Sequence, residues 1–144
     1  MAIELIAVPA GSMHDAAIIA LRTRVLRAPL GLHFTPEQLA AEAHQQRLAA
    51  VVDGTIAACI LLAPLDRMVM KFRQMAVDPA HQGKGLGMTL LNYAEAVTRS
   101  NHYTRIELHA RETAIGFYEQ AGYQCIGEPF MEVTIPHRKM VKPC

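Results

Sequence analysis

The feature that most constrains this chain is the glycine-rich segment QGKGLG at residues 82–87. An apolar run that ends at Asp78 and Pro79 precedes it, and a helical pattern beginning at Leu86 follows it. Glycine lacks a Cβ, so the backbone can turn tightly and a ligand can approach the N–H groups at the helix start. These groups lie at the positive end of the helix dipole, which favours an anion such as a phosphate or pyrophosphate. The segment therefore predicts a strand, a phosphate-binding loop and a helix in succession.

The spacing of the glycines disfavours two common phosphate-binding motifs. A dinucleotide fingerprint needs G-x-G-x-x-G, whereas Gly83, Gly85 and Gly87 follow one another at every second position. A Walker loop needs a glycine five residues before its Gly-Lys pair and a Ser or Thr after it. Here Asp78 and Gly85 occupy those two positions. Kinase and dehydrogenase functions are therefore disfavoured.

Two segments resemble those of the GNAT N-acetyltransferase superfamily. Gln82, Gly85 and Gly87 match the Q/R-x-x-G-x-G/A motif of that family, and FYEQAGY at residues 117–123 is similar to its F-Y-x-x-x-G-F/Y segment. The order of predicted elements also matches, so the resemblance covers nearly the whole chain. It implies an acyltransferase that transfers the acetyl group of acetyl-coenzyme A (acetyl-CoA) to a primary amine by direct attack in a ternary complex. The alternative is a non-catalytic GNAT-fold module that binds acyl-CoA as a sensor or regulator.

The hydrophobic pattern predicts one domain over residues 1–144, with an α/β (α+β) fold. We expect a mixed, mostly antiparallel twisted sheet of about seven strands flanked by about four helices, as in the GNAT fold. Helices are predicted at residues 13–27, 36–46, 86–100 and 112–121. Strands are predicted at residues 2–8, 47–52, 55–62, 68–77, 103–109, 123–126 and 130–135, with Pro136 marking the end of the last one or an edge position.

The composition limits the classes of binding partner that we expect. Of 144 residues, 51% are hydrophobic and 19% charged, which is typical of a globular chain, and a net charge of +1 gives no field that would attract nucleic acid or a membrane surface. Cys59, Cys125 and Cys144 lack the spacing of a zinc site or a disulfide framework, so no metal is expected. The N-terminus lacks a signal-peptide pattern. We expect a cytoplasmic protein, and a homodimer is possible because such folds commonly dimerise.

The resemblance implies a set of coenzyme contacts. In the family, the strand before the glycine loop carries a bulge whose N–H groups meet the coenzyme, including the thioester carbonyl, and such donors stabilise an oxyanion. Many members also place an Asn near the start of the last helix; here Arg111 or Thr113 is the candidate substitute. The residues implied to contact the coenzyme are Met75, Ala76, Val77, Gln82, Gly83, Lys84, Gly85, Leu86, Gly87, Met88 and Tyr118.

The catalytic candidates are Tyr118, His109 and Glu107. The resemblance gives Tyr118 the role of protonating the departing thiolate, although its spacing would equally suit a core position. An amine nucleophile is largely protonated near neutral pH, so a base is needed. Glu107 and His109 share one face of a predicted strand, and His titrates near neutrality. A hydrogen-bonded structural role is the alternative for His109, and His81 and His137 receive no role.

The amine acceptor is not identified by any motif. In the family, specificity usually resides in the segment that corresponds to residues 24–37. Arg22, Arg24 and Arg27 form a charged cluster at the end of the first predicted helix. Most such clusters are solvated faces, but a substrate carboxylate becomes plausible if one of these arginines faces the cleft.

Overall fold

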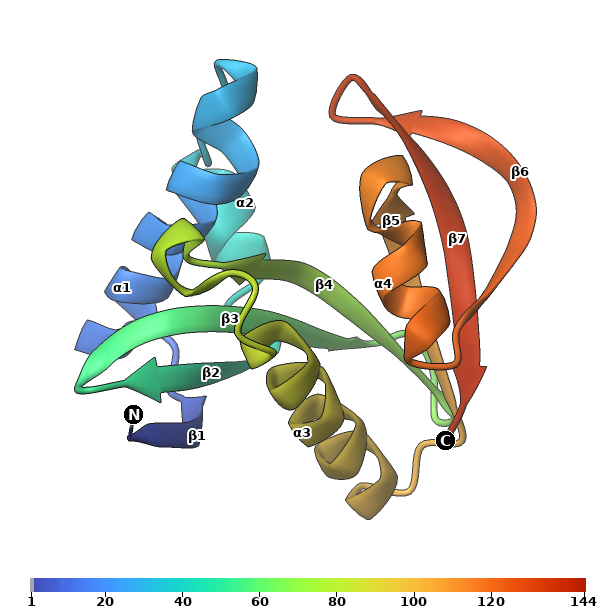
Figure 1. Cartoon of the computed structure of the whole chain (residues 1–144), viewed down its shortest axis with the longest axis horizontal. Coiled ribbons are helices and arrows are strands. Elements are labelled where there is room, and N and C mark those ends of the chain that lie inside the picture. Colours follow the sequence, from blue (N-terminus) through green and yellow to red (C-terminus); the bar gives the residue numbers. More distant parts are fainter. Residues whose placement is uncertain (1) are drawn as a thin grey trace.

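The computed structural model describes residues 2–144, and this part of the chain forms a twisted seven-stranded sheet in the order β1-β2-β3-β4-β5-β7-β6 (Figure 1). Neighbouring strands are antiparallel except for β4 and β5, which run parallel. The mixed, mostly antiparallel sheet predicted from the sequence is confirmed. The strands are Ile3–Val8 (β1), Gln46–Val52 (β2), Thr55–Pro64 (β3), Val69–Val77 (β4), Arg105–Arg111 (β5), Gln124–Glu132 (β6) and Ile135–Pro143 (β7).

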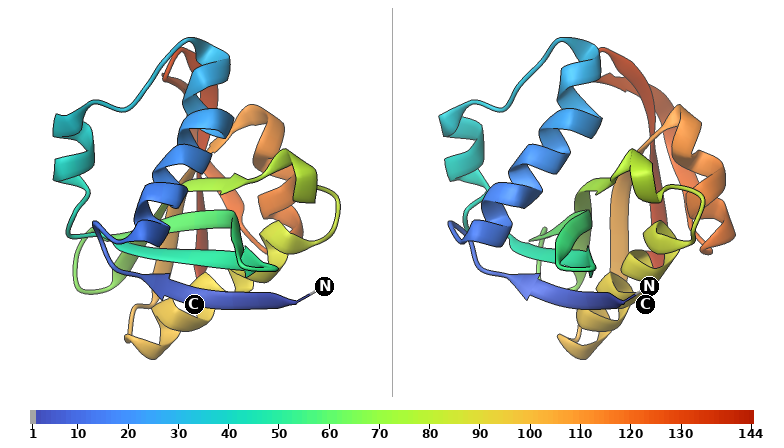
Figure 2. Two further views of the ribbon diagram at one scale, coloured as in Figure 1. Left: turned by 90° about the vertical axis from the view of Figure 1, so that its left-hand side faces the viewer. Right: turned by 60° about the vertical axis from the view of Figure 1, so that its left-hand side comes forward.

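Helices cover both faces of this sheet. Within residues 2–144 the α-helices are Met13–Arg22 (α1), Pro36–Ala41 (α2), Leu86–Ser100 (α3) and Ile115–Gln120 (α4). α1 packs on β3 and β4 from one side, and α3 packs on β2, β3 and β4 from the other, as the two views of Figure 2 show. None of the helices formed by residues 2–144 has the length and apolar character needed to span a bilayer.

Strands β2 and β3 are buried on both faces, which explains their continuous apolar sequences. In β2, Leu48 joins the core beneath α3, whereas the next residue, Ala49, joins the core beneath α1. Strand β5 alternates instead: Ile106 and Leu108 are buried, and the residues between them point to the other face. The predicted separation of the two faces of β5 is therefore confirmed.

The first helix ends earlier than predicted. α1 stops at Arg22, and a π-helix, Thr23–Arg27 (η1), and a short 3₁₀ turn, Ala28–Leu30 (η2), follow it. The hydroxyl of Thr23 donates to the carbonyl of Ile19 at 2.8 Å, a side-chain bond that competes with the backbone ladder. A π-helix adds a residue to each turn, so side chains at the end of this segment point in directions that an α-helix would not give.

The second helix is also shorter than predicted, ending at Ala41 rather than near residue 46. Glu42 caps it, and the carboxylate of Glu42 accepts hydrogen bonds of 2.9 and 2.8 Å from the fully buried guanidinium of Arg22. Burying this charge pair fixes the end of α2 against α1. Gln46 already belongs to β2. This ending depends on a contact between residues distant in sequence, which helix periodicity does not reveal.

The last part of the chain corrects the prediction of two short strands at residues 123–126 and 130–135. β6 is continuous across that gap, and its register with β7 shifts between Ile126 and Phe130. The reversal occurs at Val133 and Thr134, which have positive φ angles of 44° and 68°. Neither residue favours this conformation, so the turn has no sequence signal.

Pro136 does not end a strand, so of the two predicted positions only the edge position is compatible with the structure. It is the second residue of β7, which lies between β5 and β6. A proline is tolerated there because it lies outside the ladder with β5, whose last pair joins Arg111 and His137. The predicted terminal strand is therefore replaced by a long interior strand. Cys144 is half-buried and donates to the carbonyl of Tyr103 at 3.1 Å.

Strands β4 and β5 pair over a short distance and then separate. Their pairs run from Val69 with Arg105 to Phe72 with Leu108. Beyond Phe72 the strands diverge (Figure 1). Strands β1 to β4 form a first arm of the molecule, and strands β5 to β7 form a second arm. Two cavities lie between these arms.

A buried polar cluster holds the second arm to α3. The hydroxyl of Tyr123 donates to Glu95 at 2.7 Å, and the ammonium of Lys142 lies 3.1 Å from both carboxylate oxygens of Glu95. Lys142 also donates to the carbonyl of Ala121 at 2.7 Å, which closes the end of α4. Burial, and then the hydrogen bond to Glu95, raise the pKa of the Tyr123 phenol. Glu95 therefore accepts bonds from two separate parts of this arm.

We expect Glu95→Ala to lower the free energy of unfolding by about 2 kcal/mol, because it leaves a buried hydroxyl and a partly buried ammonium without their acceptor. The measurement is urea unfolding, read as a lower midpoint at unchanged slope. Glu119→Ala, on the exposed face of α4, is the matched control and should change stability by less than about 0.5 kcal/mol. Equal effects from the two variants would contradict a structural role for the cluster.

Candidate active site

The two cavities between the arms meet at three residues. Met75, Ala114 and Tyr118 line both of them. The larger cavity, about 780 Å³, lies beside the glycine-rich segment, and the smaller one, about 130 Å³, lies beside the ends of β5 and β7. We call them the loop cavity and the arm cavity. A ligand in one would meet a ligand in the other at Tyr118.

Ten of the eleven predicted coenzyme contacts line the loop cavity. Lys84 does not; it is exposed, and its contribution to phosphate binding rests on charge alone. Of the two candidate substitutes for the family asparagine, Thr113 lines the loop cavity and Arg111 lines the arm cavity. The contacts brought together are Met75, Ala76, Val77, Gln82, Gly83, Gly85, Leu86, Gly87, Met88 and Tyr118.

The glycines serve different purposes in this loop. Gly83 and Gly85 have φ angles of +78° and +76°, a region that other residues enter at a cost. Gly85 is the N-cap of α3 and has no side chain to bond the first N–H groups of the helix, so no side chain caps them. At Gly87, an added Cβ would lie 3.4 Å from both Phe117 and Val77. Its absence lets α3 approach β4 and α4 closely.

Strand β4 carries the bulge that the family resemblance implies. Cys59 of β3 pairs with Ala76, but Leu61 pairs with Arg73, so Gln74 and Met75 together face a single residue of β3. Gln74 has a φ of 56°, a conformation that a non-glycine residue adopts rarely. A bulge breaks the ladder and frees N–H groups at this point, directly at the junction of the two cavities.

Tyr118 is held at that junction by aromatic neighbours. Its ring packs edge-on against Phe117 and Tyr123, with centroids 5.0 and 5.7 Å away. Its hydroxyl donates to the sulfur of Met75 at 3.5 Å, and a thioether is a weak acceptor that a better one can replace. Burial raises the pKa of Tyr118 to about 12, so the phenol keeps its proton across the physiological range.

Three ionisable side chains, His109, Glu132 and His137, lie together at the arm cavity, and His109 and Glu132 are hydrogen-bonded. The Nδ1 atom of His109 lies 2.9 Å from one carboxylate oxygen of Glu132, and Nε2 of His137 lies 3.6 Å from the other. The Phe130 ring packs edge-on against His109 at 4.9 Å and stacks on His137. Burial alone would raise the pKa of Glu132, but the His109 hydrogen bond and neighbouring positive charges lower it below its ordinary value. The carboxylate therefore stays ionised and orients His109.

Glu107 does not lie with this group. It is on the same face of β5 as His109, as predicted, but its carboxylate lies 3.4 Å from Lys139 and 3.3 Å from Arg105. It lines neither the arm cavity nor the loop cavity. A shared strand face does not bring Glu107 and His109 to the same cavity, because residues i and i+2 of a strand lie nearly 7 Å apart.

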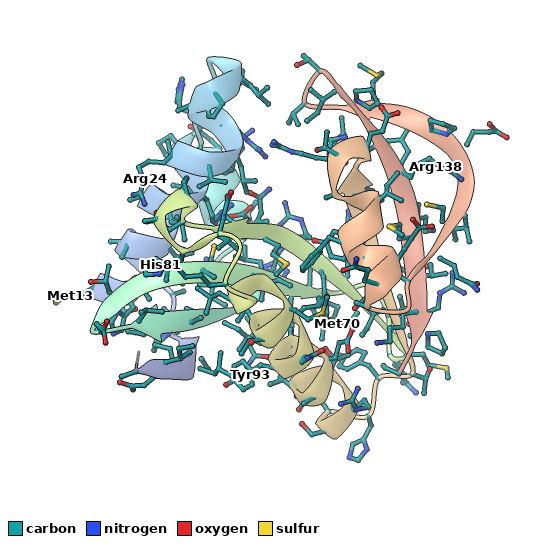
Figure 3. All side chains as sticks on the ribbon, viewed as in Figure 1. Met13, Arg24, Met70, His81, Tyr93 and Arg138 are labelled. Carbon is teal, nitrogen blue, oxygen red and sulfur yellow. The ribbon has the colours of Figure 1, made fainter. Side chains whose placement is uncertain are left out.

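The three arginines at the end of α1 have different environments. Arg22 is fully buried against Glu42, and Arg24 is exposed and pairs with Asp78 at 2.9 Å. Figure 3 places Arg24 on the same side of the molecule as His81, away from Arg138 on the second arm. Arg27 lines the arm cavity. One member of the cluster therefore faces the cleft.

Sequence reasoning missed Glu132 and gave His137 no role. Glu132 ends β6, and its neighbours reveal nothing of its orientation, because the β6–β7 hairpin register depends on a turn without a sequence signal. The only available indication was the placement of Glu132 and His137 on either side of a predicted strand end. His81, expected to be solvated, lines the loop cavity, and its Nδ1 atom is buried without a hydrogen-bond partner among residues 2–144.

Comparisons with known proteins agree with this geometry. The family model of the acetyltransferase (GNAT) domain matches residues 30–144. A candidate N-acetyltransferase from Lactobacillus plantarum is 26% identical, and its solved structure superposes with a TM-score of 0.86 over 99% of both chains. An aminoglycoside 6′-N-acetyltransferase solved with coenzyme A has the same fold, with a TM-score of 0.82 over 97% of this chain and 96% of that one, at 15% identity.

A curated relative matches part of the sequence. The uncharacterized protein YyaT of Bacillus subtilis (strain 168) is 32% identical over 72 residues, which are 50% of this chain and 49% of YyaT. The family model covers far more of the chain, including the glycine-rich segment, α4 and both strands of the second arm. The chain belongs to the GNAT acetyltransferase family and is an acyltransferase.

Proposed function

We propose that this enzyme transfers the acetyl group of acetyl-CoA to a primary amine by direct attack, with both substrates bound at once. The observation that carries the proposal is the meeting of two cavities at Met75, Ala114 and Tyr118. The loop cavity would take the coenzyme and the arm cavity the acceptor. The reacting groups would then meet beside the β4 bulge and the Tyr118 hydroxyl, without an acyl-enzyme intermediate.

The loop cavity suits the coenzyme. When bound, acetyl-CoA supplies an acyl group activated as a thioester. The uncapped N–H groups at the start of α3 would bind its pyrophosphate, as the family motif implies. The bulge at Gln74 and Met75 would offer N–H groups to the acyl oxygen, where negative charge develops. Acetyl is the proposed acyl group, because a longer one would need more room at the junction of the two cavities.

Tyr118 and His109 would move the protons. As the amine nitrogen bonds to the acyl carbon and the carbon–sulfur bond breaks, the amine must lose a proton and the sulfur must gain one. Tyr118 would donate to the sulfur, since its pKa of about 12 keeps it protonated, while a thiol of ordinary pKa near 8.5 leaves as a thiolate. His109, oriented by Glu132 at 2.9 Å, is the proposed base.

Acetyl-CoA should stabilise the protein against heat, by about 2.7 kcal/mol at a hundred times its dissociation constant, whereas ATP and NAD should not. Gly85→Glu should remove this stabilisation, because it adds a negative charge and a side chain where the pyrophosphate would lie. The measurement is a thermal shift with the three ligands in parallel.

Gly54→Glu is the matched control for that experiment. Gly54 has a φ of +82° in the β2–β3 turn, so its substitution costs similar backbone strain far from the cleft. It should lower the melting temperature yet keep the acetyl-CoA shift. Stabilisation by ATP or NAD instead of acetyl-CoA would refute the coenzyme assignment.

Tyr118→Phe should lower kcat by about a hundredfold, the usual contribution of a general acid, because only the proton donor is removed. The Phe ring keeps the packing against Phe117 and Tyr123, so the acetyl-CoA thermal shift should be unchanged. Release of free thiol from acetyl-CoA gives the rate. Unchanged kcat would reduce Tyr118 to a packing residue.

His109→Gln should likewise lower kcat by about a hundredfold, with coenzyme binding retained, because the proton acceptor is lost. His14→Gln, on the exposed face of α1, is the control and should leave kcat unchanged. Rates are compared over a pH series in which the wild-type enzyme stays folded. If His109→Gln keeps the wild-type rate and pH profile, the base lies elsewhere.

A further inference from the structure

The arm cavity holds more positive than negative charge. Arg27, Arg73 and Arg111 line it, and Glu132 is the one acidic residue among its lining residues. Arg73 is already bonded, 2.7 Å from the side-chain oxygen of Gln45 and 3.3 Å from a carboxylate oxygen of Glu42. Arg27 and Arg111 are therefore the cations whose charge this cavity leaves available.

Arg27 and Arg111 converge from opposite arms of the cleft. Arg27 lies on η1 and Arg111 at the end of β5, yet both donate to the carbonyl oxygen of Leu26, at 3.2 and 2.9 Å. Within residues 2–144, neither guanidinium lies within 4.0 Å of a carboxylate oxygen. Burial lowers the pKa of both groups, and the charge of Arg111 lowers that of Arg27 further, while the carboxylate of Glu132 acts in the opposite direction on both. Glu132 is thus the anion near them, but its carboxylate pairs with His109 and not with either guanidinium.

Arg27 is held in this position rather than left free. Its guanidinium carbon lies 4.7 Å from the ring centroid of Phe34, and that of Arg22 lies 4.4 Å from the same centroid. Such cation–π contacts restrain a long side chain before any ligand binds. Ligand binding to that side chain then costs less conformational entropy. Phe34 lies between the end of the π-helix and the start of α2.

Resting on the proposed function, we infer that the acceptor is an amine that also carries an anionic group, a carboxylate or a phosphate, bound by Arg27 and Arg111. Guanidinium forks bind both oxyanions with paired hydrogen bonds. The ammonium end of the same molecule would then face Glu132 and His109, the acidic and basic groups that line the same cavity. A cavity of about 130 Å³ suits a small molecule of this kind.

The coenzyme does not explain these arginines. Neither Arg27 nor Arg111 lines the loop cavity, where the coenzyme phosphates are proposed to bind. They lie beyond Tyr118 and Met75, on the side of the junction that the proposed mechanism gives to the acceptor. The anion that they would bind therefore belongs to the second substrate.

The test compares matched amines in the thiol-release assay. Free α-amino acids are paired with their amides, which lack the carboxylate charge, and phosphoethanolamine is paired with ethanolamine. For the wild-type enzyme we expect the anionic member of at least one pair to have a kcat/KM about tenfold to a hundredfold higher. Preference within the amino acid pairs would identify a carboxylate, and preference within the other pair a phosphate. Equal kcat/KM throughout, with measurable turnover, would overturn the inference and leave the acetyltransferase assignment intact.

Substitutions test whether Arg27 and Arg111 cause the preference for the anionic amine. Arg27→Gln and Arg111→Gln should each reduce it to less than about threefold, mainly through KM, while Arg111→Lys should restore part of it. Arg99→Gln, at the exposed end of α3, should keep it. The acetyl-CoA thermal shift checks that each variant is folded. A preference that survives both glutamine variants would place the anion elsewhere and refute the assignment to these arginines.

A binding measurement separates this inference from the proposed function. N-acetyl-amino acids, which resemble the products, are titrated calorimetrically into the enzyme with coenzyme A present. Binding to the wild type that weakens about tenfold or more in Arg111→Gln supports the anion site even if no amine is acetylated. Absence of both binding and charge-dependent turnover would overturn it.

Discussion

The separation of β4 from β5 is the constraint on which the site depends. Pairing stops at Phe72 and Leu108, where β4 turns away through its bulge and β5 continues towards Arg111. Parallel strands that stayed paired would bury these backbone groups in a closed sheet. Because they diverge, the same two strands supply the N–H groups of the bulge on one wall and His109 on the other. The proposed acyl transfer would thus take place where the sheet fails to continue.

The arginines around this opening differ in whether a carboxylate of the protein pairs with them. Those that are paired stabilise the fold, and the others are available to a ligand. Arg22 is paired with Glu42, although its Nη1 atom has no hydrogen-bond partner among residues 2–144, and Arg47 is paired with Asp15 at 2.7 Å. Both pairs hold α1 and α2 on the sheet. Arg27 lies five residues after Arg22, at the end of the π-helix, and no carboxylate among residues 2–144 pairs with it in this way. Residue type alone does not separate these arginines. Their partners do, and the partners come from distant parts of the chain.

Local features explain which predictions succeeded. The glycine-rich segment, the start and end of α3 and the separation of the two faces of β5 follow from backbone requirements and periodicity within a few residues, and the structure agrees with them. Glu132 could not be found in this way, since its orientation is set by a hairpin whose turn residues, Val133 and Thr134, are poor turn formers. The position of the Glu107 carboxylate outside both cavities could not be found in this way either, since ion pairs with Arg105 of the same strand and Lys139 of β7 hold it.

The two arms differ in how deeply they are buried, and this sets a gradient of local stability across the cleft. β2 and β3 are almost completely inaccessible to solvent, whereas β6 is largely exposed, pairs only with β7 and has an interrupted register. Amide hydrogens of β6 must therefore exchange through openings that cost much less free energy than those of β2 or β3. The wall that carries Glu132 is accordingly the compliant side of the cleft, and the wall beneath the glycine-rich loop is the rigid one.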